Sequence, residues 1–308
     1  MNVGAPGTRR ALLQRGAALA LTPWSSARGQ ARPQAAAPPS SEAIEPSGQA
    51  TVAQDRLPIF DAHVHYSHDA VELVPPKQAV QILRQAGLRG AFVSSSNDEG
   101  TKRLIAEAPD LIAPELRPYR TRSEISTWTR DDSVLRYLEE RLAKYRYAGI
   151  GEFHLYGEDA DLPVPKRMVA LARQHGLLLH AHSDVDAIER LFRQWPEARV
   201  LWAHSGFDRP QKVREVLRRH PRLWSDLAFR GDQANGSKVD AAWRAAFDEF
   251  PERFVIGTDT FTPERWHYIS THADYSRGWL ADLPEPLSAN IGWRNAEGLL
   301  RGSKAKAA

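Results

Sequence analysis

The segment FDAHVH, residues 60–65, joins an apolar run that begins at Leu57 to two histidines one residue apart. Side chains alternate along a strand, so His63 and His65 point to the same face, and Asp61 shares their parity. Two neutral imidazoles on one face at the end of a buried strand can hold one metal ion such as zinc. The segment therefore predicts a buried strand that ends at a metal site, although two polar residues at a strand end would give the same pattern.

Outward from this segment, short apolar, β-branched or aromatic stretches alternate with segments of helical spacing. Strands are expected near residues 59–65, 90–96, 111–118, 148–154, 177–182, 199–204, 222–228 and 253–259. Helices are expected between them, at 76–86, 131–147, 164–174, 185–194, 210–219, 239–250 and 288–300, with a short one at 101–107. Eight strands, each followed by a helix, predict an α/β fold of the closed parallel (β/α)8 type, a TIM barrel.

The first 56 residues differ from the rest of the chain. Arg9 and Arg10 precede a short, weakly apolar stretch at 16–21, which is too short to span a membrane. TRRALLQRG resembles a bacterial twin-arginine export signal, so residues 1–31 are expected to send the protein to the periplasm, with a disordered basic tail as the alternative. Residues 32–56 are rich in Ala, Pro, Ser, Gln and Glu and predict a disordered linker. Residues 57–308 are left for the barrel domain.

Length and charge narrow the class of protein. With 308 residues and 42% hydrophobic content, the chain can bury a sizeable core, and one barrel of roughly 250 residues fits within it. The formal charge of +3 comes from residues 1–31, which carry four arginines and no acid, and the remaining chain has a net charge of −1. Neither nucleic acid nor a membrane is therefore an expected partner. A small-molecule substrate is expected, and a homo-oligomer stays open. The absence of cysteine excludes disulfides, thiolate ligands and a cysteine nucleophile.

Side chains suited to metal binding stand where five of the expected strands end. Besides the two histidines of the first strand, these are Glu152 and His154 in GIGEFH, His180 and His182 in LLLHAH, His204 in VLWAH and Asp259 in FVIGTD. Active sites of parallel barrels lie at the carboxyl ends of the strands, so these groups should converge at one mouth. Each alone is more often structural, but together they predict a metal centre.

This constellation resembles the amidohydrolase superfamily over about residues 57–301. GIGEFHLYG is similar to the strand-4 segment of TatD-type metal-dependent hydrolases, and IGTDTF is similar to the strand-8 motif of the amidohydrolase-2 group. The resemblance implies a divalent metal, with zinc expected. His63, His65 and Asp259 would hold a first ion, and His180 and His204 would hold a second, with Glu152 between them. The strand-4 lysine that many members carry is absent here, so Glu152 would have to bridge if two ions bind; one ion or two stays open.

The fifth strand offers two histidines of the same parity. We expect His180 to be the ligand because three leucines lead directly to it. His182 would then lie behind the ligands or contact the substrate. His154, which has the same parity as Glu152, would likewise be a reserve ligand.

The implied reaction is hydrolysis of an amide, ester or lactone, because zinc lowers the pKa of a bound water to about 7. Asp259 would take the proton from that water and deliver it to the leaving group. Three alternatives remain. They are a metal-dependent decarboxylase of the amidohydrolase-2 type, a TatD-like nuclease, against which the near-neutral chain argues, and a metal-holding barrel without catalysis.

Substrate contacts are sought in the loops at the same mouth. In LRPYRTR, the side chains of Arg117, Arg120 and Arg122 suit an anionic group, or they form only a solvated cluster. Trp128 and Trp266 are expected to form an apolar rim. Near the seventh strand, Asp226 and Arg230 either line the site or simply pair with other groups.

Overall fold

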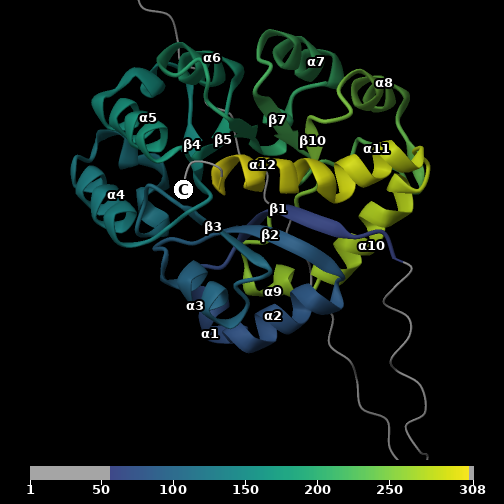
Figure 1. Cartoon of the computed structure of the whole chain (residues 1–308), viewed down its shortest axis with the longest axis horizontal. Coiled ribbons are helices and arrows are strands. Elements are labelled where there is room, and N and C mark those ends of the chain that lie inside the picture. The colour runs from purple at the N-terminus through teal and green to yellow at the C-terminus, as the bar shows by residue number, and fades with distance from the viewer. Residues whose placement is uncertain (1–55, 305–308) are drawn as a thin grey trace, which may run out of the picture. The chain divides into compact units, whose positions relative to one another are not determined.

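Eight parallel strands form one sheet that curls into a nearly closed barrel (Figure 1). The computed structural model describes residues 56–304, so the predicted export signal and nearly all of the predicted linker fall outside the described residues. In their order within the sheet, the strands are β1 (Ile59–His65), β2 (Leu88–Ser94), β3 (Ile112–Leu116), β4 (Gly149–Leu155), β5 (Leu178–Ser183), β6 (Val200–Trp202), β7 (Leu223–Asp226) and β10 (Phe254–Val255). The predicted (β/α)8 barrel is confirmed, and each predicted strand overlaps an observed one.

The barrel closes between β1 and the segment that follows β10. The backbone N–H of Asp259 donates to the carbonyl oxygen of His63 at 2.8 Å. The buried side chain of Asp61 accepts hydrogen bonds from the backbone N–H and the hydroxyl of Thr258, at 3.0 and 2.7 Å. This seam places the last strand beside the first, and it therefore brings Asp259 next to His63 and His65.

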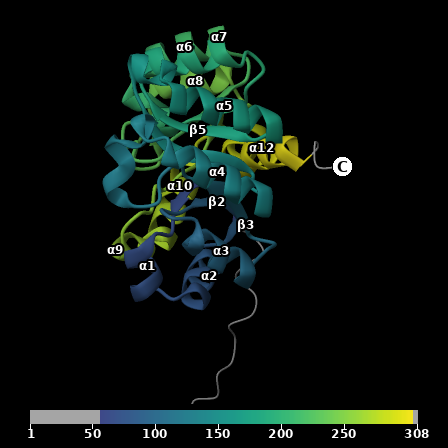
Figure 2. The ribbon, with the colours of Figure 1, turned by 90° about the vertical axis from the view of Figure 1, so that its left-hand side faces the viewer.

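Helices surround the strands of the barrel (Figures 1 and 2). Those expected from the sequence are α2 (Pro76–Gln85), α3 (Glu99–Glu107), α4 (Ser133–Lys144), α5 (Pro163–His175), α6 (Val185–Gln194), α7 (Pro210–Arg219) and α8 (Ala241–Glu249). The structure adds α1 (His68–Leu73), α9 (Pro263–Trp266) and α10 (Ile269–Leu280), which the spacing of apolar residues did not predict. The expected helix at 288–300 is divided into α11 (Glu285–Ala289), a π-helical turn at 290–294 and α12 (Asn295–Lys304). A short hairpin, β8 (Ala234–Asn235) with β9 (Lys238–Val239), precedes α8.

Two apolar clusters hold the barrel together. The larger one lies between the strands and the surrounding helices. The smaller one includes Phe60, Phe92 and Leu201 on the strands, and Ala296 and Leu299 of α12. Figure 1 shows α12 lying across the strands, where these side chains close one end of the barrel. Because apolar residues fill that end, the buried polar groups of the strands gather toward the other end.

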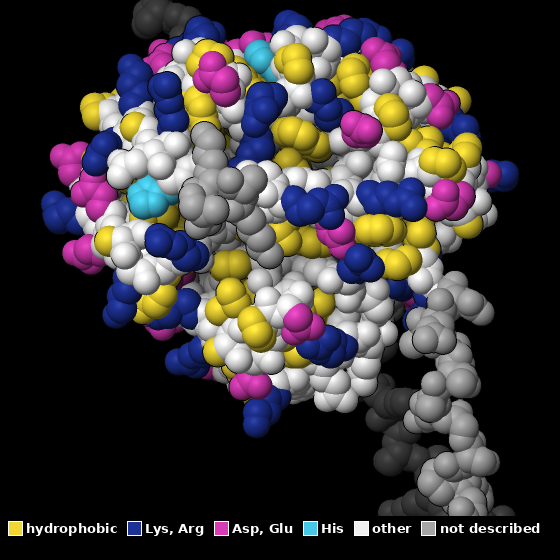
Figure 3. Space-filling model, viewed as in Figure 1, with side chains coloured by type: hydrophobic (Ala, Val, Ile, Leu, Met, Phe, Trp, Pro, Cys, Tyr) yellow, Lys and Arg dark blue, Asp and Glu magenta, His cyan; other side chains and the backbone are white. Residues whose placement is uncertain are grey.

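The surface drawn in Figure 3 is the face crossed by α12, and basic and acidic side chains are interspersed on it. Among residues 56–304, no helix combines the length and the apolar character that crossing a membrane requires.

Candidate metal centre

Four side chains converge at the mouth of the barrel, and they come from β1, from β4 and from the segment that follows β10. The Nε2 atoms of His63 and His65 lie 3.1 Å apart. Nε2 of His65 lies 3.1 Å from Oδ1 of Asp259 and 3.2 Å from Oε2 of Glu152. All four residues are buried. The structure thus brings together the four groups that the sequence placed at three separate strand ends.

Two further histidines face Glu152 from the other side. Nδ1 of His182 lies 2.9 Å from Oε1 of Glu152, and Nε2 of His204 lies 3.6 Å from the same oxygen and 3.7 Å from Oδ2 of Asp259. His204 is buried, whereas His182 is partly exposed and lines the pocket. Oε2 of Glu152 therefore faces His65, whereas Oε1 faces His182, His204 and also His63, whose Nε2 lies 3.4 Å away.

The outer nitrogens of three histidines are held by protein groups. Nδ1 of His63 lies 3.0 Å from Oδ2 of Asp226, Nδ1 of His65 lies 2.7 Å from the hydroxyl of Ser94, and Nδ1 of His204 lies 2.9 Å from the carbonyl oxygen of Ala228. Such contacts fix the ring orientation and leave Nε2 free for a metal. The sequence placed Asp226 only near the site. Its position at the end of a strand was the signal that it belonged to this cluster.

His180 lies deeper in the barrel than the sequence suggested. Its Nδ1 is 2.9 Å from Oε2 of Glu115, and its Nε2 is 3.3 Å from Oδ2 of Asp226. The register of β5 explains this position, because His180 pairs with Gly151 whereas His182 pairs with His154 at the strand end. In the structure His182, rather than His180, contacts Glu152, whereas His180 forms with His63 and Asp226 another group whose ligand atoms lie within 4.8 Å of one another.

Charge is concentrated in this cluster. Burial disfavours a charged His63, but the carboxylates of Asp259, Glu152 and Asp226 outweigh burial and raise its pKa well above the usual value. Burial raises the pKa of Glu152, yet His63 and the other neighbouring imidazoles lower it well below its ordinary range. The pKa of Asp259 likewise falls to about 2 despite burial, because of His63 and His65. The carboxylates are thus ionised at neutral pH, and a metal ion would displace a proton from His63.

His154 completes the wall behind Glu152. Its ring stacks on His182 at a centroid distance of 4.2 Å, and its Nδ1 lies 3.0 Å from the hydroxyl of Tyr119. Burial lowers the pKa of His154 to about 4, so its ring is neutral at neutral pH. Glu152, His154 and His182 also form a group whose ligand atoms lie within 4.8 Å of one another. His154 is therefore positioned as a reserve ligand or a substrate contact.

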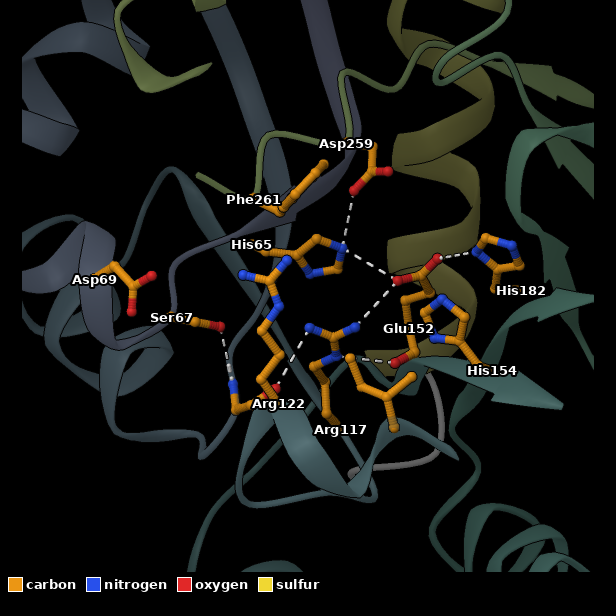
Figure 4. A pocket seen from close by; sticks show the side chains of 12 residues that line it. His65, Ser67, Asp69, Arg117, Arg122, Glu152, His154, His182, Asp259 and Phe261 are labelled. Atoms are coloured by element: carbon orange, nitrogen blue, oxygen red, sulfur yellow. Dashed lines mark hydrogen bonds and ion pairs between the residues drawn. The ribbon is translucent and has the colours of Figure 1, made fainter. Parts of the chain in front are cut away.

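A pocket of about 210 Å³ opens beside the cluster (Figure 4). Its lining residues are His65, Ser67, Asp69, Ser96, Arg117, Arg122, Ile125, Glu152, His154, His182, Asp259 and Phe261. The predicted apolar rim is wrong, because Trp128 and Trp266 are fully buried. Trp128 instead donates from its indole nitrogen to the carbonyl oxygen of His154 at 2.9 Å.

The three arginines of the loop after β3 have different surroundings. Arg117 is buried and donates to Oε2 of Glu152 at 3.2 Å and to its carbonyl oxygen at 3.1 Å. Arg120 forms ion pairs with Glu124 and Asp131 at 2.8 and 2.9 Å, and it does not line the pocket. The side chain of Arg122 lines the pocket. Arg117 and Arg120 were expected to contact the substrate. In the structure Arg117 orients Glu152, and Arg120 is paired with Glu124 and Asp131.

The donor set suits a divalent metal. Imidazole and carboxylate ligands bind zinc at about 2.0–2.2 Å, so neighbouring ligand atoms on one ion lie roughly 3–3.5 Å apart. The contacts among His63, His65, Glu152 and Asp259 fall close to this range, from 3.1 to 3.5 Å. The combination of free Nε2 atoms, ionised carboxylates and anchored outer nitrogens is what a metal of this class requires.

Comparisons with known proteins place this barrel in a family. A family model described as Amidohydrolase matches residues 60–302. The fold is similar to that of a β-aspartyl dipeptidase from Fervidobacterium islandicum AW-1, with 16% identity, coverage of 78% of this chain and 72% of that one, and a TM-score of 0.51. It is also similar to a TatD homologue from Escherichia coli K12, with 18% identity, coverage of 78% and 97%, and a TM-score of 0.50. No curated protein matches the sequence. Since the family model spans most of the described chain, the protein belongs to the amidohydrolase family.

Proposed function

We propose that this protein is a metal-dependent hydrolase that cleaves an amide, ester or lactone bond. The observation that carries this proposal is the convergence of Nε2 of His63 and His65 with Glu152 and Asp259 within 3.1–3.5 Å at the mouth of the barrel. These four residues, together with His182 and His204, are the proposed ligands. Zinc is the proposed ion because the donors are imidazoles and carboxylates.

The two oxygens of Glu152 support a site for two ions. Oε2 faces His65 at 3.2 Å, and Oε1 faces His182 at 2.9 Å, His63 at 3.4 Å and His204 at 3.6 Å. One ion would lie among His63, His65 and Asp259, and the other beside His182 and His204, with Glu152 between them. Arg117 holds Glu152 in the required orientation through its carboxylate and its carbonyl oxygen.

When bound, the metal supplies an acidified water and polarises the carbonyl of the substrate. Asp259 is the proposed general base and later the general acid. Its carboxylate lines the pocket, and it is ionised because its pKa is low. The pocket of about 210 Å³ has room for a small molecule, which supports the proposal of a small-molecule substrate.

The test is metal content per chain together with turnover on a panel of esters, lactones and amides. Wild type should contain one or two equivalents, and His63→Ala should lose metal. Asp259→Asn is expected to lower kcat by at least 10²-fold, in the range for removal of a general base. Full turnover by an Asp259→Asn protein that still holds its metal would refute the proposed role of Asp259. A metal-free wild type, even after growth with added zinc or manganese, would refute the proposed function itself.

Export to the periplasm is a separate proposal, supported by the arginine pair and the short apolar stretch within residues 1–31. Fractionation of cells that express the full chain, with Arg9→Lys/Arg10→Lys as the control, tests it. Retention of the variant in the cytoplasm is expected, and equal export of both proteins would contradict the proposal.

A further inference from the structure

Exposed aromatic side chains surround the candidate metal centre. Phe207 stacks on His204 with ring centroids 4.6 Å apart, and Phe229 lies 6.0 Å from the same ring. Phe229 is in turn 6.1 Å from Phe261, which lines the pocket. These three phenylalanines, here called the aromatic rim, lie among the most exposed large apolar side chains of the described residues. They provide apolar surface beside His204, and the guanidinium of Arg265 lies over the Phe229 ring, 4.2 Å from its centroid.

The backbone makes the rim unusual. Phe207 and Phe229 both have φ values of 54°, a left-handed conformation that disfavours side chains with a Cβ. These two residues are 57% and 48% exposed, so burial of their rings offsets little of the backbone strain. Within residues 56–304, all five non-glycine residues with positive φ follow β6, β7 or β10, at the mouth of the barrel. Clustered backbone strain of this kind is typical of functional sites. It therefore indicates that the two phenylalanines contact a ligand and do not chiefly stabilise the fold.

Arg122 supplies a charge on the same pocket. It is exposed, and it makes no hydrogen bond or ion pair with any residue of the described chain, unlike its neighbours Arg117 and Arg120. Figure 4 draws it among the side chains that line the pocket. A guanidinium without a protein partner, aimed at a pocket, is suited to bind a carboxylate in a bidentate manner.

We propose that the substrate is a small organic anion with a flat apolar body, whose carboxylate binds Arg122 and whose body packs on the aromatic rim. This inference rests on the proposed function, because it assigns a substrate class to the same site. Ile125 and Phe261 supply apolar walls between the two features, since both line the pocket with Arg122. Glu152 is already paired with Arg117 and His182, and Asp259 with His65, so Arg122 is left to attract the anion with or without a bound metal.

Three probes separate the charge from the ring. Benzoate has both, benzamide has the ring without the charge, and acetate has the charge without the ring. Isothermal titration of metal-loaded and of metal-free protein should give a millimolar or tighter Kd for benzoate, and binding on the order of tenfold weaker for each of the other two. Arg122→Gln should weaken benzoate on the order of tenfold and leave benzamide unchanged, and Arg122→Lys should recover part of the loss.

The rim is tested with Phe207→Gly and Phe229→Gly. Both should weaken benzoate while leaving acetate unchanged, and Tm should stay the same or rise, because glycine relieves the left-handed strain. A fall in Tm with unchanged benzoate affinity would show that the rings serve only the fold, and it would overturn the rim. Matched controls are Tyr268→Ala, an exposed aromatic outside the rim, and Arg130→Gln, an arginine of the same loop that is paired with Asp159. Both controls should bind benzoate as wild type does.

The outcomes distinguish a failure of the proposed substrate class from a failure of the hydrolase proposal. Equal affinities for benzoate and benzamide, no binding of benzoate at millimolar concentration, or full binding by Arg122→Gln would each overturn the substrate class. Metal content is measured on every variant and should equal that of wild type. If the protein holds no metal but the benzoate pattern appears in the metal-free protein, the hydrolase proposal fails and the anion site stands. If metal and esterase activity are present without the benzoate pattern, the substrate class alone fails.

Discussion

Replacing Asp226 by asparagine should weaken both the fold and the metal centre. Oδ1 of Asp226 accepts hydrogen bonds from the backbone N–H groups of His204 and Ala228, at 2.8 and 3.0 Å. Oδ2 faces Nδ1 of His63 at 3.0 Å and Nε2 of His180 at 3.3 Å. Asparagine has nearly the same shape and can keep the two backbone bonds. Its NH2 group, however, would then stand against two imidazole nitrogens that now face a carboxylate.

The size of each effect follows from these contacts. Removing one partner of a buried ion pair costs about 3–5 kcal/mol, and Asp226→Asn removes a charge that is completely buried. The new NH2 group would donate to Nδ1 of His63. The ring would then carry its proton on Nε2, the atom that is proposed to bind the metal. Loss of a partner behind a metal-bound histidine lowers metal affinity about 10–100-fold.

Glu115→Gln is the matched control, because Glu115 contacts His180 at 2.9 Å but does not contact His63. Urea unfolding of metal-free proteins should show that both variants are destabilised. Zinc titration against a chromophoric chelator, after circular dichroism has shown that the proteins are folded, should show weaker binding only for Asp226→Asn. Zinc affinity unchanged from wild type in Asp226→Asn, or equal losses in the two variants, would refute this account of how His63 is oriented.

Three further predictions follow from the same contacts. His182→Ala should lower bound metal at least as much as Glu152→Ala, whereas His180→Ala should lower stability and leave more of the metal bound; the reverse order would restore His180 as the ligand of β5. Burial opposes a charge on His180, but its acidic neighbours raise its pKa to about 9. The stability it contributes to the metal-free protein is therefore complete below about pH 6.5 and should be lost as pH rises through about 9, so urea midpoints that rise over this range would contradict the prediction. Arg199→Met should cost about 1–3 kcal/mol per uncompensated carbonyl, because buried Arg199 donates to the carbonyl oxygens of Leu299 and Gly176 at 2.7 Å; an unchanged thermal midpoint would count against this.

The sequence predicted the barrel and most of the residues at its mouth because both depend on local patterns. The alternation of short apolar runs with helical spacing gives the strands in order, and polar residues that end apolar runs mark the active-site face. His63, His65, Glu152, His204 and Asp259 were found in this way. The family resemblance supplied the proposed roles of these residues, which the local pattern alone does not give.

The choice between His180 and His182 depended on register, which a single strand does not contain. An irregularity between Gly151 and Phe153 shifts β4 against β5, so Glu152 meets His182 and not His180. Parity along one strand treats both histidines alike, because residues two apart share a face. Only the pairing of neighbouring strands decides which one reaches the mouth.

The apolar rim was predicted from the wrong side chains because burial in loops has no periodic signal. The sequence assigned Trp128 and Trp266 to loops, but the structure places Trp128 in a 3-10 turn and Trp266 at the end of α9, and it buries both of them. Phe207 and Phe229 are isolated residues after strand ends, where nothing in the sequence reveals a left-handed backbone. Their position became clear only from the path of the loops in three dimensions.

The seam between β1 and the segment after β10 links the metal centre to the order in which the chain folds. Asp61 and Thr258 are bonded across it although they are 197 positions apart in the chain. Contacts between residues so distant in sequence carry a high entropic cost and form slowly. A nascent chain that carries His63 and His65 without Asp259 offers an ion only part of its ligand set. The protein should therefore retain metal tightly only after the barrel has closed. Tight metal binding would then distinguish fully folded molecules from those that are still folding.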